Sequence, residues 1–332
     1  MRIFLAGDYY SGTGPANVTK YYIDNLPEGT LYQKRRNPVA RVPEIVINTI
    51  RSDVVVYSGY SKQNIVGLKV AKILKKPSAY IMHGCVEYEN EINLEPDEEM
   101  NRVERTTIAM ADLVIAVSEK FCEWLKGYYP GYADKFDHVY NGIDTSLKNE
   151  AADRTGADRH MIFSIGGGMP RKKIRYICEA VEKLRKEYDD RLRLCVIGDR
   201  GADSEVIRSY DFVEDRGIVP FSETKSLFAK AALFVQNSCF ETFGLAPVEA
   251  VASGCPVLCS RAVGALDVFE DVRSEDVIEK FDDPEEIASK IRYLLENPNA
   301  QRLSESIKWE SVSWKTRSSD LASKLSALVL KK

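Results

Sequence analysis

The sequence of 332 residues lacks the features of membrane-spanning chains and nucleic-acid-binding proteins. No run approaches the roughly 18 uncharged apolar residues that are needed to span a bilayer. The opening segment, residues 1–8, breaks its apolar pattern too soon for a signal peptide. The formal net charge of -4 is small and of the wrong sign for binding a phosphate backbone. We therefore expect a cytoplasmic protein that does not bind nucleic acid.

Cysteine and histidine are too few and too scattered for a disulfide framework or a transition-metal site. The seven cysteines are odd in number, contain no CxxC spacing and lie mostly in apolar contexts, which predicts reduced and buried thiols. The three histidines, His83, His138 and His160, contain no His-x-x-x-His pair. We therefore expect no transition-metal centre.

Short β-branched runs, in contrast, recur along the whole chain. They are continuous rather than alternating, which predicts strands covered on both faces. The expected strands are residues 2–7, 53–58, 78–83, 113–118, 138–140, 161–165, 192–197, 217–219, 233–236 and 256–260. Helical periods lie between them, for example Ile177, Ala180, Val181 and Leu184. This alternation predicts an α/β protein with parallel sheets.

The polar stretch 144–160 has no apolar face and divides the chain into two series of strands. We expect two Rossmann-like, doubly wound domains facing each other across a cleft, at 1–145 and 161–310. A linker at 146–160 joins them, and a C-terminal helix follows at 311–332. That helix either crosses back to the first domain or packs on its own domain.

Two glycine-rich loops follow predicted strands. Gly12 and Gly14 precede a helical pattern, where backbone amides can approach a phosphate or another substrate; an ordinary tight turn fits equally well. The same loop, with the basic run 34–36, also leaves an NADP-dependent oxidoreductase open. Gly167 and Gly168 precede the cations Arg171 and Lys172 in a second loop. This combination favours a diphosphate site over a solvated basic turn.

A pair of acidic residues lies eight positions apart around a predicted helix start. Glu241 is in a loop after a strand, and Glu249 follows Pro247, which suits the first turn of a helix. Both carboxylates can accept hydrogen bonds from sugar hydroxyls, and the amides at 243–245 can meet an anion. Ordinary surface acids are the alternative. The apolar neighbours of the two acids favour a ligand site.

Segment 237–257 resembles the E-x7-E signature of retaining nucleotide-sugar glycosyltransferases with the GT-B fold, glycosyltransferase family 4 (group 1). The resemblance extends over nearly the whole chain and includes 111–118, 140–144 and 196–199. It implies that the acceptor binds mainly to the first domain and the sugar nucleotide mainly to the second.

Individual roles follow from the same resemblance. The residues expected to take part in catalysis are Glu241, which would hold hydroxyls of the transferred sugar, Lys172, which would bind phosphate, and His83, which would line the donor-sugar pocket. Glu249 would bind the ribose hydroxyls. The residues expected to contact the nucleotide sugar are, in addition, Arg171, Gly167, Gly168, Phe243, Gly244, Leu245, Gly12 and Gly14. One departure is Gly167, which stands where the family usually has arginine; Arg171 can supply that charge.

The resemblance implies transfer of a hexose from a nucleotide sugar, with a UDP-sugar favoured, to a glycan or lipid-linked acceptor in polysaccharide or glycoconjugate synthesis. The sequence has no Asp-x-Asp metal signature, so we expect metal independence and no cofactor. A catalytically silent subunit that binds a glycan or a partner enzyme is the alternative, because Gly167 replaces arginine. Basic clusters at 34–41 and 69–76 leave peripheral contact with the inner face of a membrane open, although solvated helix faces are favoured.

Overall fold

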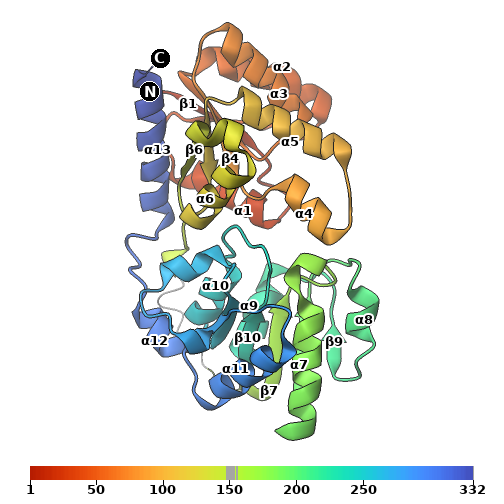
Figure 1. The fold of residues 1–332 in the computed structure, drawn as a ribbon. Helices are drawn as coiled ribbons and strands as arrows, with labels where there is room; N and C mark the ends of the chain where they lie inside the picture. Colours follow the sequence, from red (N-terminus) through yellow and green to blue (C-terminus); the bar gives the residue numbers. More distant parts are fainter. Residues whose placement is uncertain (147–153, 155, 332) are drawn as a thin grey trace. The chain divides into compact units, whose positions relative to one another are not determined.

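The computed structural model describes residues 1–146, 154 and 156–331 and divides the chain into two compact units (Figure 1). Unit 1 comprises Met1–Tyr88, Pro96–Asp144 and Glu310–Lys332. Unit 2 comprises Glu89–Glu95 and Thr145–Trp309. Residues 147–153 and 155 of the expected linker lie outside the described residues, and its last residues, from Asp158, already belong to a strand of unit 2.

Unit 1 is built on six parallel strands in the order β2-β1-β3-β4-β5-β6. Their bounds are β1 Ile3–Gly7, β2 Leu31–Tyr32, β3 Val54–Ser58, β4 Ser78–Met82, β5 Leu113–Ala116 and β6 Phe136–His138. Every residue of β1, β3 and β4 is buried, as continuous apolar runs predict. β1 and β3 pair in a register that places Gly7 opposite Ser58, at the carboxyl end of both strands.

Helices accompany this sheet, and polar side chains fix where several of them begin. The helices are α1 Gly14–Asn25, α2 Pro38–Arg51, α3 Lys62–Ile73, α5 Glu98–Met110, α6 Glu119–Tyr128, the 3-10 helix η1 Pro130–Lys135 and α13 Trp314–Leu330. The helix α4 Val86–Asn93 begins in unit 1, and its residues from Glu89 on belong to unit 2. Asn37, Ser61 and Ser118 accept hydrogen bonds from amides in the first turns of α2, α3 and α6. Such caps satisfy N–H groups that the helix itself leaves without a partner.

The C-terminal helix α13 belongs to unit 1, which decides the alternative that the sequence left open. The Trp314 ring stacks on Tyr21 of α1 with ring centroids 4.7 Å apart, and Trp314 is buried. A Cβ atom on Gly142 would lie 2.5 Å from the Trp314 ring, so only glycine permits this approach. Figure 1 shows α13 alongside the sheet of unit 1.

Unit 2 is also built on six parallel strands, in the order β12-β11-β10-β7-β8-β9. Their bounds are β7 Asp158–Ile165, β8 Arg193–Ile197, β9 Val213–Asp215, β10 Ala231–Gln236, β11 Val257–Ser260 and β12 Val277–Ile278. From β7 the chain proceeds outward through β8 and β9, and it then returns to place β10 on the other side of β7. The strand order therefore reverses between β7 and β10, and ligands bind at such a reversal in open α/β sheets.

The helices of unit 2 bury the apolar faces that the sequence predicts. They are η3 Pro170–Lys172, α7 Ile174–Glu187, α8 Ser204–Arg208, α9 Phe221–Lys230, α10 Ala246–Ala252, η4 Gly264–Val268, η5 Ser274–Asp276, α11 Pro284–Glu296 and α12 Ala300–Glu305. Ile177, Ala180, Val181 and Leu184 of α7 are all buried in one apolar cluster, which confirms the predicted period.

The strand expected at 217–219 is wrong. Gly217 has a φ of +63° and its N–H bonds to the Asp215 side chain in a turn, a conformation that cannot continue a strand. The edge strand of this region is β9, which ends at Asp215. The two-residue strands β2 and β12 have no counterpart among the expected strands, because two residues are too short to show a period.

Candidate functional site

Two loops of unit 2 meet where its strand order reverses. Lys172 follows β7 and Glu241 follows β10, so parallel pairing of the two strands brings together side chains that are 69 residues apart in sequence. Backbone bonds tie the loops to each other: Cys239 N donates to Arg171 O at 2.9 Å. We refer to Arg171, Lys172, Gln236 and Glu241 as the crossover cluster.

The centre of the crossover cluster is an ion pair between Lys172 Nζ and Glu241 Oε2. Gln236 Nε2 donates to the same carboxylate oxygen at 2.9 Å, and Arg171 Nη1 lies 3.8 Å from it. The side chains of the three charged residues are only 12 to 16% exposed. One carboxylate is therefore surrounded by two cations and an amide donor, and Arg171 Nε lies 3.5 Å from a second carboxylate, that of Glu89.

Burial and charge act in opposite directions on the pKa of each member of this ion pair. Burial raises the pKa of Glu241, but the cations Lys172 and Arg171, with hydrogen bonds from Lys172 and Gln236, outweigh it and hold this pKa below its usual range. Burial lowers the pKa of Lys172, and repulsion from Arg171 adds to the fall, while Glu241 opposes it. The Glu241 carboxylate is therefore ionised at neutral pH.

The glycines of the β7–α7 loop have a packing role. A Cβ atom on Gly167 would lie 1.9 Å from Asp199 O, and one on Gly168 would lie 2.0 Å from Ser204 Oγ. The N–H of Gly167 donates to Ile197 O, and that of Gly168 donates to Asp199 O. The N–H groups of both glycines therefore already donate hydrogen bonds to backbone oxygens. If these glycines contact the diphosphate as predicted, they do so by letting the backbone approach it and not by donating these N–H groups.

The helix expected to carry Glu249 is present, and the role of Glu249 at a ligand stays a prediction. Glu249 lies half-buried in α10, which begins at Ala246 and ends at Ala252, just before Gly254 with a φ of +72°. A Cβ atom on Gly244 would lie 2.9 Å from Glu241 Cγ, so this glycine lets the loop close over the carboxylate. Phe243 is buried, and no described hydrogen bond uses the N–H of Gly244 or Leu245. The role of those amides in binding an anion stays a prediction.

Three predicted residues, His83, Gly12 and Gly14, belong to unit 1. His83 follows β4, and its Nε2 lies 2.8 Å from Ser58 Oγ. Burial lowers the pKa of His83 to about 4, so the imidazole is neutral at pH 7. Gly12 and Gly14 lie in the β1–α1 loop, and a Cβ atom on either would meet nothing within 4 Å.

Sequence reasoning missed three residues that shape these sites. Gln236, which is 3% exposed, bonds to Glu241, and its Oε1 is a buried atom without a hydrogen-bond partner among the described residues. Gly166 packs under the Lys172 stem, where a Cβ atom would lie 2.3 Å from Lys172 Cγ. Ser58 holds His83. A polar residue at the end of an apolar strand is a signal that could have revealed both Gln236 and Ser58.

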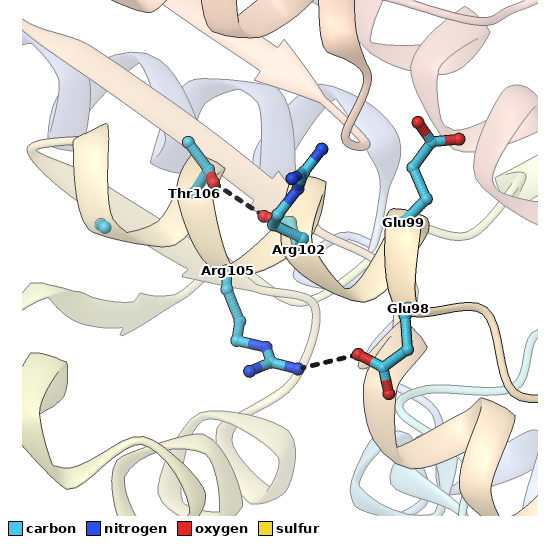
Figure 2. A pocket seen from close by; sticks show the side chains of 6 residues that line it. Glu98, Glu99, Arg102, Arg105 and Thr106 are labelled. Atoms are coloured by element: carbon cyan, nitrogen blue, oxygen red, sulfur yellow. Dashed lines mark hydrogen bonds and ion pairs between the residues drawn. The ribbon is translucent and has the colours of Figure 1, made fainter.

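A surface hollow of about 620 Å³ lies on α5 and contains none of the predicted residues (Figure 2). Its lining comes from this one helix: Glu98, Glu99, Arg102, Arg105, Thr106 and Ala109. Figure 2 shows Arg105 facing Glu98, at 3.8 Å, and the Thr106 hydroxyl donating to Arg102 O. Glu98 pairs with Arg105 and Glu99 pairs with Lys62 outside the hollow, so we do not consider this hollow a candidate site.

The described residues were also searched for metal-binding groups and for helices that could cross a membrane. Among residues 1–146, 154 and 156–331, no group of three His, Cys, Asp or Glu side chains is arranged to hold a metal ion. None of the helices formed by the described residues has the length and apolar character needed to cross a membrane.

Comparison with family models gives two consecutive matches. The model described as Glycosyltransferase Family 4 matches residues 6–147, and the model described as Glycosyl transferases group 1 matches residues 148–308. The first match lies in the part of the chain that carries His83, and the second contains the crossover cluster and Glu249.

Individual relatives are more distant. The chain is 33% identical over 114 residues to the O-antigen chain mannosyltransferase B of Escherichia coli, covering 32% of this chain and 30% of that protein. It is 25% identical over 268 residues to the D-inositol 3-phosphate glycosyltransferase of Thermobifida fusca, covering 73% of this chain and 62% of that one. The aligned stretches thus span less than two thirds of either relative.

Solved structures share the fold over almost the full length. The crystal structure of Anabaena HepE in complex with UDP and glucose gives a TM-score of 0.73 at 16% identity, covering 98% of this chain and 100% of that one. Sucrose-phosphate synthase from Thermosynechococcus elongatus gives a TM-score of 0.71 at 15% identity, covering 100% of both chains. At these identities the likeness concerns the fold.

Proposed function

Because the chain belongs to the group 1 glycosyltransferases, with the GT-B fold, we propose that it transfers a hexose from a nucleotide sugar to a glycan or lipid-linked acceptor. A UDP-sugar is the favoured donor, and UDP is bound by the structurally similar HepE protein. We further propose that transfer is metal-independent and retains the anomeric configuration. Its expected setting is the cytoplasm.

The observation that carries this proposal is the crossover cluster. A buried cluster with two cations, Lys172 and Arg171, lies where the strand order of unit 2 reverses, which is where a ligand is expected in such a sheet. Lys172 and Arg171 both contact Glu241, and each can contact a diphosphate in place of part of that interaction. The two cations therefore do not have to move far to bind the donor. The carboxylate of Glu241 is then able to accept hydrogen bonds from sugar hydroxyls.

The chemistry proposed here needs no covalent intermediate. The bond between the sugar C1 and the leaving phosphate oxygen breaks, and a bond from the acceptor oxygen to C1 forms on the same face. The acceptor hydroxyl proton passes to the departing phosphate. Because charge on the diphosphate increases as the bond breaks, fixed cations at Lys172 and Arg171 stabilise the transition state more than the ground state.

Binding and turnover can be separated by two variants. We expect Glu249→Ala to weaken UDP binding by about tenfold, on the scale of a charge-assisted hydrogen bond. Glu241→Ala should instead reduce transfer while UDP still binds. Isothermal titration with UDP and turnover of radiolabelled sugar nucleotides measure the two effects. Equal UDP affinity in wild type and the Glu249 variant would count against the assignment.

Donor identity and the silent-subunit alternative require a further experiment. Thermal shifts with UDP, GDP, ADP and dTDP identify the base, because a ligand that binds only the folded state raises the unfolding temperature. A labelled sugar-nucleotide panel, with and without acceptors, then tests turnover. Binding without transfer or hydrolysis would support the silent subunit, which is motivated by Gly167.

A further inference from the structure

The outward face of α2 in unit 1 is apolar, although it is exposed. Val39 is 82% exposed, Ile47 is 52% exposed and Ile50 is 55% exposed, and Pro43 is exposed as well. At 3.6 residues per turn these four positions fall within about 80° around the helix axis. A surface helix normally presents charged and polar side chains on this face. The four residues therefore form an apolar stripe along α2 and are not isolated exposed positions.

The end of α3 adds to this stripe. α3 lies beside α2, and Lys76 Nζ, just after α3, donates at 2.6 Å to Ile50 O in the last turn of α2 (Figure 1). The last turns of the two helices therefore lie together. Ile73 is 78% exposed there and Leu74 is 42% exposed, so the same end of α2 is accompanied by two further exposed apolar side chains.

The charged residues of this region are almost all basic. Between residues 45 and 86 the only acid is Asp53, against one arginine and five lysines. Asp53 Oδ2 accepts a hydrogen bond from Arg2 N at 2.6 Å, and Lys62 pairs with Glu99 of α5. The exposed cations near the ends of the two helices are Arg51, Lys69, Lys72 and Lys75. We refer to the apolar stripe together with these four cations as the α2–α3 surface.

We propose that the α2–α3 surface binds an anionic lipid bilayer, with its apolar side chains at the boundary of the acyl chains and its cations at the phosphate headgroups. Helices that combine an exposed apolar face with basic residues lie in the plane of a membrane interface. Each Lys or Arg close to an anionic surface adds to the attraction. This binding does not depend on the function proposed above, but it would bring the chain to the surface at which a lipid-linked acceptor is found.

Composition and charge favour a lipid surface over a protein partner or a second copy of the chain. Protein interfaces are enriched in aromatic residues and depleted of lysine. The α2–α3 surface combines aliphatic side chains with three lysines and has no aromatic member. A second copy docked face to face would place like charges against each other. The charge that complements four cations is negative, and an anionic bilayer supplies it together with an apolar phase.

Co-sedimentation with vesicles tests the proposal on the full chain in the absence of any substrate. Vesicles of equal parts phosphatidylglycerol and phosphatidylcholine present an anionic surface, and vesicles of phosphatidylcholine alone present a neutral one. We expect the wild type to bind the anionic vesicles at least tenfold more tightly than the neutral ones. Added salt should weaken the binding, because it screens exposed charges.

The apolar stripe is tested by the double variant Ile47→Ser/Ile50→Ser. Both side chains are exposed, so the fold should persist, and circular dichroism checks this. Binding to anionic vesicles should fall at least tenfold, on the scale of burying one aliphatic side chain. The matched control is Val206→Ser/Ile218→Ser in unit 2, where the two side chains are 49% and 75% exposed. The control should bind as wild type does.

The cations are tested by the triple variant Lys69→Ala/Lys72→Ala/Lys75→Ala. Each cation near an anionic surface contributes about a fivefold factor, so binding to anionic vesicles should fall at least tenfold. Binding to neutral vesicles should not change. The matched control removes the same charge by Lys→Ala changes at three exposed lysines of unit 2, Lys186, Lys230 and Lys280.

Several outcomes would overturn the proposal. One is wild-type chain that stays in solution with anionic vesicles or binds neutral vesicles equally well. Another is an equal loss of binding in the variants and their controls. A dimer in sedimentation equilibrium that Ile47→Ser/Ile50→Ser separates, without vesicle binding, would show that a second copy covers this face instead. Absence of turnover in wild type would contradict the proposed function and leave the vesicle test intact.

Discussion

The two glycine-rich loops look alike in sequence but differ in what surrounds their glycines. In the β1–α1 loop, added Cβ atoms on Gly12 and Gly14 would meet nothing within 4 Å. In the β7–α7 loop, added Cβ atoms on Gly166, Gly167 and Gly168 would all lie within 2.3 Å of another atom. The first loop is open, and the second is packed against a neighbouring loop beside the crossover cluster. A glycine pattern alone does not distinguish a loop open to a ligand from one that packs on the chain itself.

The largest effect is expected where the packed loop is forced to carry a side chain. Gly167→Arg restores the residue type that the family usually has, but position 167 has a φ of +55° and its Cβ atom would overlap Asp199 O. Strain and overpacking together should lower the free energy of unfolding by about 3 kcal/mol or more. Urea unfolding followed by circular dichroism measures this. A variant as stable as wild type would show that the β7–α7 loop can rearrange to accept a side chain. It would then not be more tightly constrained than the β1–α1 loop.

Separating the ion pair of the crossover cluster should have the next largest effect. Lys172→Met leaves the Glu241 carboxylate poorly compensated in a buried site, and we expect a loss of about 2 kcal/mol, less than for a fully isolated pair because Arg171 remains at 3.8 Å. The double variant Lys172→Met/Glu241→Gln removes both charges and should recover most of that stability without recovering transfer. Additive losses in the double variant would show that the two side chains do not interact.

A smaller effect is expected from pH. The pKa of an ordinary lysine is about 10.4. The pKa of Lys172 is lower in the folded chain, so Lys172 loses its charge at a lower pH there than in the unfolded chain. Nucleotide affinity should fall, by up to about tenfold per pH unit, as pH rises through this lowered pKa. At the acid end the ionised form of Glu241 is lost only as pH falls through its lowered pKa. Titrations of UDP across alkaline pH should lose this dependence in Lys172→Met.

The smallest effect is expected in the open loop. Gly14→Ala places a methyl group at the first residue of α1, where nothing lies within 4 Å, and should change the free energy of unfolding by less than about 0.5 kcal/mol. Its unfolding midpoint in urea should match that of wild type. A loss comparable to that of Gly167→Arg would remove the distinction between the two loops.

Much of the fold could be predicted from the sequence, because buried parallel strands and amphipathic helices leave strong local patterns. The period of Ile177 to Leu184 identified α7 correctly, and Pro247 with Gly254 marked the limits of α10. What failed were features without a period, such as the two-residue edge strands. The turn at Gly217, read as a strand, failed because a left-handed backbone conformation cannot be recognised from an apolar neighbourhood.

The site was predictable in its residue types but not in its connections. Lys172 and Glu241 were both selected, yet nothing local indicates that they form an ion pair, since that depends on β7 lying next to β10. The packing of Gly167 could not be predicted for the same reason. Its neighbour is Asp199, from a different loop, and only the assembled sheet brings the two together.

The account depends on the crossover cluster being the place where a nucleotide diphosphate binds. Isothermal titration of UDP into Lys172→Met tests this most directly. Lys183→Met is the matched control, because Lys183 lies in α7, the helix that follows Lys172, but pairs with Glu285 at the surface. We predict that UDP affinity falls by at least tenfold, on the scale of a charged hydrogen bond, in Lys172→Met and stays at the wild-type value in Lys183→Met. Equal affinities in the two folded variants would contradict the account.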